Sequence, residues 1–453
     1  MQNNKSIVKS ATFLGVGTFI AKLLGALYRV PLTAILGGVG LGLYQMVFPV
    51  YALLLDFSGA SLPSALSKLI SSKEEGEKYK NAHALLNVSA RFFALFGFVL
   101  SALLMIFARP LARLQGNEDA FYAYIFLAPA IFLVSLISVF RGYFQGLMNM
   151  KPTTLSQIVE QFVKLILGVL FAYLLRKTTP LAVAGATFAI TLSEFVALIQ
   201  LFITYKRHKK QFHLNFAFNR LEFKIRLKSV IKTTLPITLV GILIPLSQVV
   251  DSFIIINLLS VYRSDSTALY GLLSGVCMTV INLPVAVCYG IATTAIPAVS
   301  AQKTVQNQTA LSAKAILMTI AVALPCTVIT AVFSPLIIRI LFGSLSESNS
   351  ALSQSLLAFT SPCILLLSLV QTTNAILIGK GKLYRPLISL SLGVVIKTIL
   401  NIILIKMPSL NIYGGGAGLI ACYFVVCLIN LLMIFKFKVN YENKHACGRE
   451  YAS

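Results

Sequence analysis

The sequence has few of the residues that perform chemistry in water. It contains four histidines and seven cysteines, and the cysteines all lie in the second half without a Cys-x-x-Cys spacing. Zinc sites and activated nucleophiles need such residues close together, so neither is predicted. The segment Gly379–Lys382 lacks the spacing of a Walker-type phosphate loop, which argues against direct use of ATP. We therefore expect a protein that is not an enzyme and that has no cofactor beyond a coupling ion.

Charged residues are also scarce. Only 11% of the 453 residues are charged and 57% are apolar, and the apolar residues occur in runs of roughly 20 or more, the length that crosses about 30 Å of hydrocarbon. A backbone in lipid must satisfy its own hydrogen bonds, and uninterrupted apolar runs do so as helices. The sequence thus predicts an all-α polytopic membrane protein with about twelve spans, near residues 10–30, 42–69, 84–108, 120–147, 154–175, 180–204, 232–259, 268–299, 311–341, 352–379, 384–406 and 413–436.

Basic residues outnumber acidic ones, 38 to 14, but they are not spread evenly. If both termini are cytoplasmic, most lysines and arginines fall in segments on the inner side of the membrane, as the positive-inside rule requires. The most basic of these segments, residues 205–231, is expected to rest on anionic lipid headgroups. RNA binding by this segment is a weaker alternative, so we expect membrane lipids as partners and no nucleic acid.

The two halves of the chain share a set of unusual residues at a constant separation. The separation is 234 residues, or 233 for the last pair: Tyr28-Arg29 recurs as Tyr262-Arg263, Pro63 as Pro297, Pro152 as Pro386 and Lys164 as Lys397. An even number of spans per half gives two six-helix lobes of the same orientation, related by an axis along the membrane normal, with a substrate site between them. We expect an N-terminal lobe at 1–204, a basic cytoplasmic linker at 205–231, a C-terminal lobe at 232–437 and a cytoplasmic tail at 438–453.

Basic residues inside the predicted spans are candidates for substrate binding, because an ionisable side chain in mid-membrane costs about 2.5–3.5 kcal/mol. Lys22 and Arg29, seven residues apart, share one face of the first span. Lys164 and Lys397 lie near mid-membrane in corresponding spans. A cavity lined by these side chains would attract a phosphate or pyrophosphate. The alternative is that each side chain extends to the nearer membrane surface.

Acidic and amide residues also lie inside the predicted spans. The acidic set, predicted to serve in ion coupling or charge pairing, is Asp56, Glu160, Glu194 and Asp251. Glu160 precedes Lys164 by four residues, the favourable direction for an ion pair within one helix. The coupling ion would be Na⁺ or H⁺. Asn282 and Asn401 are candidates for contact with a sugar, with helix packing as the alternative.

Several short motifs are characteristic when taken together. They are Ala21–Arg29 (AKLLGALYR), Gly42–Gln45 (GLYQ), Arg141–Gly146 (RGYFQG) with Lys151–Thr153 (KPT), Val159–Gln161 (VEQ), Ile281–Pro284 (INLP) and Lys397–Asn401 (KTILN). Through them the sequence resembles the polysaccharide biosynthesis and stage V sporulation protein B family over nearly its whole length. That family belongs to the multidrug/oligosaccharidyl-lipid/polysaccharide (MOP) exporter superfamily, which also contains the MurJ lipid II flippases and the MATE drug exporters.

The resemblance implies a MATE-like two-lobed fold and an alternating-access flippase in the bacterial cytoplasmic membrane. Its substrate would be an undecaprenyl-pyrophosphate-linked saccharide, foremost lipid II for peptidoglycan synthesis. Lys22 matches a basic position that binds the pyrophosphate in lipid II flippases, and Arg29 falls close to a second. Where those flippases have another arginine late in span 2, this sequence has Leu53–Asp56. It also has about twelve spans, whereas fourteen are common among them.

Two other functions are alternatives. A proton- or sodium-coupled exporter of cationic drugs would use acidic residues such as Asp56, Glu194 and Asp251 together with aromatic faces, but the sequence has no tryptophan. A non-transporting scaffold for sporulation or wall synthesis would not need duplicated lysines in mid-membrane. We expect a monomeric flippase driven by the membrane potential or an ion gradient, since one charge crossing 100 mV changes the free energy by about 2.3 kcal/mol.

Overall fold

The computed structural model describes most of the chain. The described residues are 2–71, 75–209, 220–300, 302, 304–382 and 384–447. Part of the predicted linker, residues 210–219, and the end of the predicted tail, residues 448–453, therefore lie outside the described residues. The side chain of Lys22 also lies outside them, although its backbone belongs to the first helix.

Helices follow one another along the described chain. Their bounds are α1 Gln2–Leu55, η1 Asp56–Ala60, α2 Leu62–Ser71, α3 Glu75–Leu114, α4 Ala120–Gly146, α5 Lys151–Leu174, α6 Thr179–Lys209, α7 Arg220–Gly241, α8 Leu243–Ser260, α9 Ser266–Gly271, η2 Leu272–Cys277, α10 Met278–Ser300, α11 Val305–Val332, α12 Ser334–Phe342, α13 Glu347–Thr360, α14 Pro362–Gly379, α15 Arg385–Ile405 and α16 Tyr413–Cys447. In this part of the chain there is no β-strand, and eleven helical stretches are long and apolar enough to cross a membrane. The all-α polytopic fold predicted from the apolar runs is confirmed.

Several of the predicted spans are interrupted helices. The first two are joined in α1, where Gly37 adopts φ 63° and ψ −171°, a conformation that glycine reaches without a Cβ clash. The seventh consists of α7 and α8, which are separated at Ile242 with Pro236 before the break and Pro245 after it. Proline lacks an N–H and so removes one helical hydrogen bond, which explains a break at this place.

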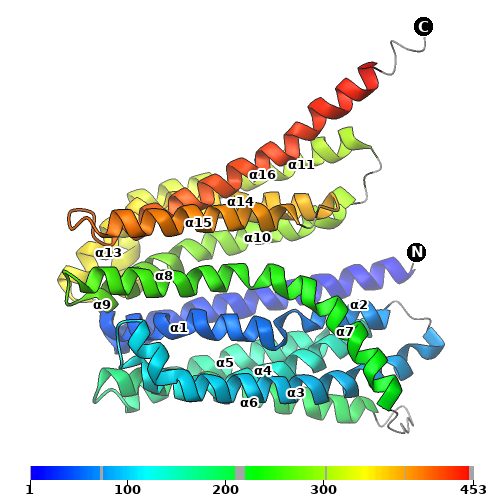
Figure 1. Cartoon of the computed structure of the whole chain (residues 1–453), viewed down its shortest axis with the longest axis horizontal. Coiled ribbons are helices and arrows are strands. Elements are labelled where there is room, and N and C mark those ends of the chain that lie inside the picture. Colours follow the sequence, from blue (N-terminus) through cyan, green and yellow to red (C-terminus); the bar gives the residue numbers. More distant parts are fainter. Residues whose placement is uncertain are drawn as a thin grey trace. The chain divides into compact units, whose positions relative to one another are not determined.

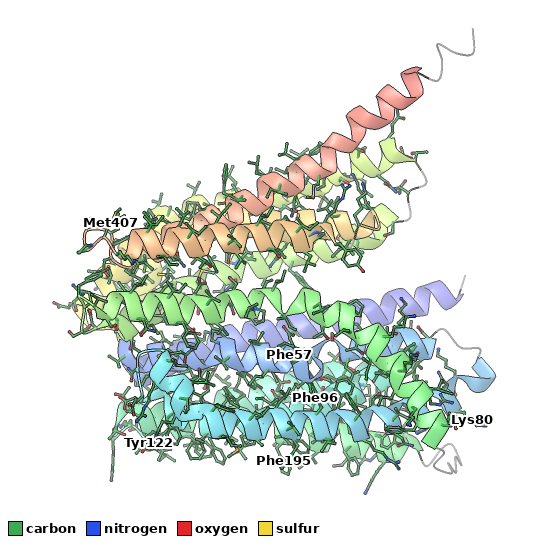
Figure 2. The ribbon with its side chains drawn as sticks, viewed as in Figure 1. Phe57, Lys80, Phe96, Tyr122, Phe195 and Met407 are labelled. Atoms are coloured by element: carbon green, nitrogen blue, oxygen red, sulfur yellow. The ribbon has the colours of Figure 1, made fainter. Side chains whose placement is uncertain are left out.

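The chain forms two compact units. The first comprises Met1–Asn257 and Asp265–Gly271, and the second comprises Leu258–Ser264 and Leu272–Ser453. In the first, α4 packs between α3 and α6, and α1 packs along α5 (Figure 1). In the second, α14 packs against α10, α11 and α16, and α15 lies along α16. Large apolar side chains such as Phe195 on α6 are exposed, as on a surface that faces lipid (Figure 2).

The sequence repeat is accompanied by a repeat of local structure. The turn from α4 to α5 and the turn from α14 to α15 each end the preceding helix with the same kind of bond, from an N–H to the carbonyl five residues earlier. These bonds join Asn149 N–H to the Phe144 carbonyl and Lys382 N–H to the Leu377 carbonyl, both at 2.9 Å. Each turn has a residue with positive φ at the corresponding place, Met148 at 60° and Gly381 at 76°. The bond and the positive φ are features of a Schellman motif, which satisfies carbonyl groups at the end of a helix. Both halves therefore use the same type of turn between these helices, as the 233-residue separation predicts.

Candidate functional site

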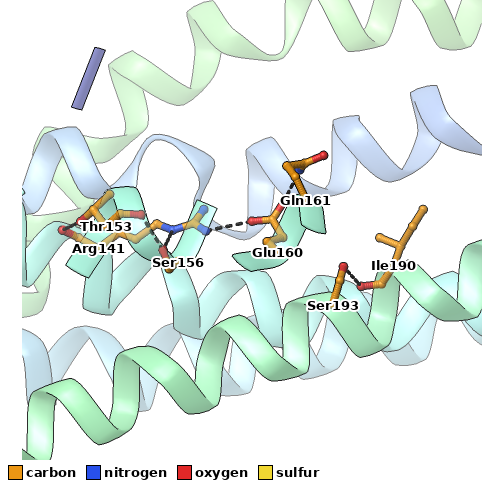
Figure 3. Close-up of polar contacts among 7 residues, drawn as sticks. All are labelled: Arg141, Thr153, Ser156, Glu160, Gln161, Ile190 and Ser193. Carbon is orange, nitrogen blue, oxygen red and sulfur yellow. Dashed lines mark hydrogen bonds and ion pairs between the residues drawn. The ribbon is translucent and has the colours of Figure 1, made fainter. Parts of the chain in front are cut away.

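A buried ion pair joins α4 to α5 in the first unit. The Arg141 guanidinium donates to Glu160 Oε2 at 2.8 Å, and their side chains are only 15% and 14% exposed. Arg141 Nε also donates to the Ser156 hydroxyl at 3.0 Å, and the Gln161 amide donates to Glu160 Oε1 at 2.8 Å (Figure 3). Both carboxylate oxygens of Glu160 are therefore bound. Glu160 thus pairs across helices with Arg141 and not with Lys164 on its own helix.

Glu194 on α6 lies beside this pair. Its side chain is buried, with 6% of the residue exposed, and its Oε2 has no hydrogen-bond partner among the described residues. The adjacent Ser193 is satisfied locally, because its hydroxyl donates to the Ile190 carbonyl at 2.7 Å (Figure 3). Glu194 interacts electrostatically with Glu160, Arg141 and Lys164. The predicted acidic residues 160 and 194 therefore belong to one cluster.

Lys164 and Arg29 bring positive charge to the same cluster. The Lys164 ammonium lies 5.9 Å from the centre of the Tyr28 ring, a cation–π distance, and Tyr28 is almost fully buried. One turn further along α5, Gly168 allows the close approach, since a Cβ there would overlap the Tyr28 side chain. Arg29 follows Tyr28 and lies within electrostatic range of Lys164. The first unit therefore gathers three cations, Arg29, Arg141 and Lys164, around two carboxylates.

In the second unit, Lys397 and Asn401 are buried between α15 and α16. Lys397 is 3% exposed and Asn401 is 1% exposed. Both pack against Gly418 of α16: a Cβ at Gly418 would overlap Asn401 Oδ1 and would lie 3.4 Å from Lys397 Cγ. The helices approach this closely because glycine leaves room for the two long polar side chains.

A buried amide network lies near these residues in the second unit. The Ser389 hydroxyl donates to Asn430 Oδ1 at 2.7 Å, and the Asn430 amide donates to Asn374 Oδ1 at 2.7 Å. By the 233-residue repeat, Ser389 and Asn374 correspond to Ser156 and Arg141. In the first half the two positions bond directly, as Arg141 to Ser156, whereas in the second half they are joined through Asn430 of α16. Arg141, Asn374 and Asn430 were not among the predicted site residues, although polar residues within apolar runs were the available signal.

The other predicted residues lie on other elements. Asp56 is partly exposed at the start of η1, and Asp251 is buried on α8, both in the first unit. Asn282 is exposed on α10 in the second unit. The structure therefore brings together Arg29, Glu160, Lys164 and Glu194, and separately Lys397 and Asn401.

The chain is similar in sequence to known proteins. A model of the family described as "Polysaccharide biosynthesis protein" matches residues 7–302, and the MatE model matches residues 236–403. Stage V sporulation protein B of Bacillus subtilis (strain 168) is 25% identical over 441 residues, covering 95% of this chain and 84% of that protein. Lipid II flippase MurJ of the same organism is 25% identical over 468 residues, covering 97% and 84%.

The fold has a close counterpart among solved structures. A multidrug resistance MATE family transporter of the MOP superfamily, in an inward-facing conformation, superposes with a TM-score of 0.76 at 17% identity, covering 93% of this chain and 96% of that one. The resemblance seen in the motifs is thereby confirmed. The chain therefore has the fold of a MATE transporter, and a family match over well more than half of its length identifies this protein as a member of the polysaccharide biosynthesis protein family.

Proposed function

We propose that this protein is a flippase that moves an undecaprenyl-pyrophosphate-linked saccharide, with lipid II as the first candidate, to the outer leaflet of a bacterial cytoplasmic membrane. The observation that carries the proposal is the cluster in the first unit, in which Arg29, Arg141 and Lys164 outnumber Glu160 and Glu194. With these groups ionised, the cluster has an excess of one positive charge, which an anion would neutralise. A pyrophosphate supplies negative charge to the cluster, whereas a cationic drug would add to its positive charge.

The three cations of the cluster have different roles in this proposal. Arg141 is already held by Glu160 and Ser156, so it fixes the framework. Lys164, which lies over the Tyr28 ring, and Arg29 are the groups we assign to the pyrophosphate, with arginine able to bind two oxygens at once. Lys22, seven residues before Arg29 in the sequence, is a further pyrophosphate contact in the proposal.

Lys397, Asn401 and Asn282 would contact the headgroup from the second half. Because Lys397 and Asn401 are buried against Gly418, α15 and α16 must separate locally before these side chains reach a substrate. We assign the two lobes, 1–204 and 232–437, to alternating access with both termini cytoplasmic and with one chain as the transport unit. The 25% identity to the lipid II flippase MurJ of Bacillus subtilis supports this substrate class.

Reconstitution tests the proposal. Liposomes that contain the purified chain and fluorescent lipid II should show flipping that falls at least about tenfold in Lys164→Gln and Arg29→Gln, equivalent to about 1.4 kcal/mol of lost interaction. Lys177→Gln, an exposed lysine in the turn after α5, is the matched control and should flip normally. Unchanged flipping in both test variants, or export of cationic dyes by a chain that does not flip lipid II, would refute the proposal in favour of a drug exporter.

A further inference from the structure

Two interrupted spans meet inside the first unit. η1 is a π-helical segment, and within it Gly59 has φ 135°, far from helical values. η1 and α2 pack against α7, close to the break between α7 and α8. The Ser61 hydroxyl is hydrogen-bonded to the Thr238 hydroxyl at 2.5 Å, which fixes the two breaks beside each other. Interrupted helices inside a membrane are tolerated where they line a binding site.

A carboxylate lies at this joint without a partner of its own. Asp56 begins η1, and its Oδ2 is 3.5 Å from the place that a Cβ of Gly241 would take. Among the residues that the structure describes, Asp56 forms no ion pair and no side-chain hydrogen bond. The side chain is partly exposed, so a small solute can reach it.

The joint lies deep in the span. Asp56 is roughly four helical turns, or about 20 Å, from Ser71 at the end of α2. The adjacent Phe57 lies between the ends of the first unit marked by Lys80 and Tyr122 (Figure 2). A carboxylate side chain is far too short to reach the membrane surface from there, so an ionised Asp56 needs a cation nearby.

The backbone supplies a second oxygen ligand. In a continuous helix the carbonyl of Gly241 would accept the N–H of residue 245, but residue 245 is proline and has none. The Gly241 carbonyl therefore loses its helical donor, and it belongs to the residue whose Cβ position lies 3.5 Å from Asp56 Oδ2. Carboxylate and freed carbonyl oxygens are the ligands of small hard cations, and the hydroxyls of Ser61 and Thr238 lie about one turn away.

We propose that Asp56 and the Gly241 carbonyl bind a sodium ion, which ties η1 to the joint between α7 and α8. The bound ion neutralises Asp56 and sets the angle between α7 and α8, so that its release would loosen the joint. The site belongs to the first half alone, because the repeat places Gly290 at the position corresponding to Asp56. The proposal does not depend on which lipid is transported.

The test measures sodium binding to the purified full-length chain without any lipid substrate. Circular dichroism follows thermal unfolding while NaCl replaces choline chloride at constant ionic strength. We expect a saturable rise of the unfolding midpoint with Na⁺, of at least about 3 °C, in the wild type. Asp56→Asn should abolish it. Asp119→Asn, an exposed aspartate, should leave it unchanged, and so should Gly290→Ala, where a Cβ meets no atom within 4 Å.

A second variant keeps the proposal testable if Asp56→Asn does not fold. Gly241→Ala adds a methyl group at an ordinary contact distance from Asp56, so it should fold, yet it occupies the place of the ion and should weaken equilibrium binding of radioactive Na⁺. Sodium stabilisation that persists in Asp56→Asn, or normal binding in Gly241→Ala, would overturn the proposal. So would a midpoint that responds to pH through Asp56 and ignores Na⁺, since Asp56 would then be a proton site. If the wild type binds sodium but does not flip lipid II, the proposed substrate would be rejected and the proposal of a sodium site would stand.

Discussion

The side-chain amide of Gln115 donates to the hydroxyl of Ser252 at 2.9 Å and thereby connects the end of α3 to α8. The same amide donates to the Met46 carbonyl at 3.0 Å, and Gln115 Oε1 accepts the Tyr124 hydroxyl at 2.6 Å. Gln115 is fully buried, so all of its bonds are made to protein. This one residue holds α1, α4 and α8 together, and it helps to explain why most of α8 belongs to the first compact unit.

Replacing Gln115 by leucine should destabilise the protein by about 2–4 kcal/mol, because three buried polar groups lose their partner at once. Tyr124→Phe removes only one of these bonds and should cost about 1 kcal/mol. Unfolding in detergent, followed by circular dichroism, checks both values. Equal effects of the two substitutions would show that Gln115 is not the centre of this network.

Removing one partner of the Arg141–Glu160 ion pair should lower the stability of the protein more than removing both partners. Arg141→Gln or Glu160→Gln leaves a largely buried charge without its partner, an effect of about 3–5 kcal/mol for buried pairs. The double variant carries no such charge, so its loss of stability should be clearly smaller than the sum of the two single losses. A double-mutant cycle on thermal unfolding measures this difference, and additive effects would mean that the pair is not coupled.

Gly418→Ala should destabilise the second unit by about 1–3 kcal/mol, because the added methyl group overlaps Asn401 and presses on Lys397. Gly290→Ala adds the same group where no atom lies within 4 Å and is the matched control. The buried cysteines of the second unit, among them Cys277 and Cys363, allow a thiol-reactive dye to report its unfolding. Similar melting of the two variants would contradict the close packing of α15 on α16.

The turn between α14 and α15 should make stability depend on pH. Burial lowers the pKa of Lys382 from its ordinary 10.5 to about 8, and the charges of Arg385 and Lys380 act in the same direction. The folded chain therefore releases this proton at lower pH than the unfolded chain, so the stability contributed by Lys382 rises between about pH 8 and 10.5.

Below pH 8 the unfavourable charge is fully present. Lys382→Gln should accordingly unfold at higher temperature than the wild type at pH 7, and the gap should close as the pH approaches 10. Lys177→Gln, an exposed lysine, should show no such convergence. Melting curves of the wild type and Lys382→Gln that stay parallel across this range would contradict the lowered pKa.

Much of the fold was predictable because membrane helices are defined locally. Apolar runs of span length predict helices wherever a backbone must satisfy its own hydrogen bonds in lipid, and the structure places helices at each of the predicted spans. The repeat was also readable, since paired residues such as Pro152 and Pro386 begin corresponding helices after corresponding turns. The breaks within spans were harder to predict, because Pro236 and Pro245 mark a region and not the angle adopted there.

The candidate site was only partly predictable. The sequence identified Arg29, Glu160, Lys164 and Glu194 as charges that need an explanation in a membrane, and the structure gathers them in one cluster. It did not identify Arg141, which supplies the ion pair of Glu160. Spacing along one helix shows which side chains share a face, but partners on another helix depend on how the helices pack.

The sequence by itself determined that the chain is helical, spans a membrane many times and repeats its design, because hydrophobicity and backbone hydrogen bonding act over a few turns. Only the tertiary structure decided that Glu160 binds Arg141, that Lys397 lies buried against Gly418, and that Asp56 lies next to Gly241. Each of these contacts joins residues of different helices. They exist because packed helices bring together groups that no local rule places side by side.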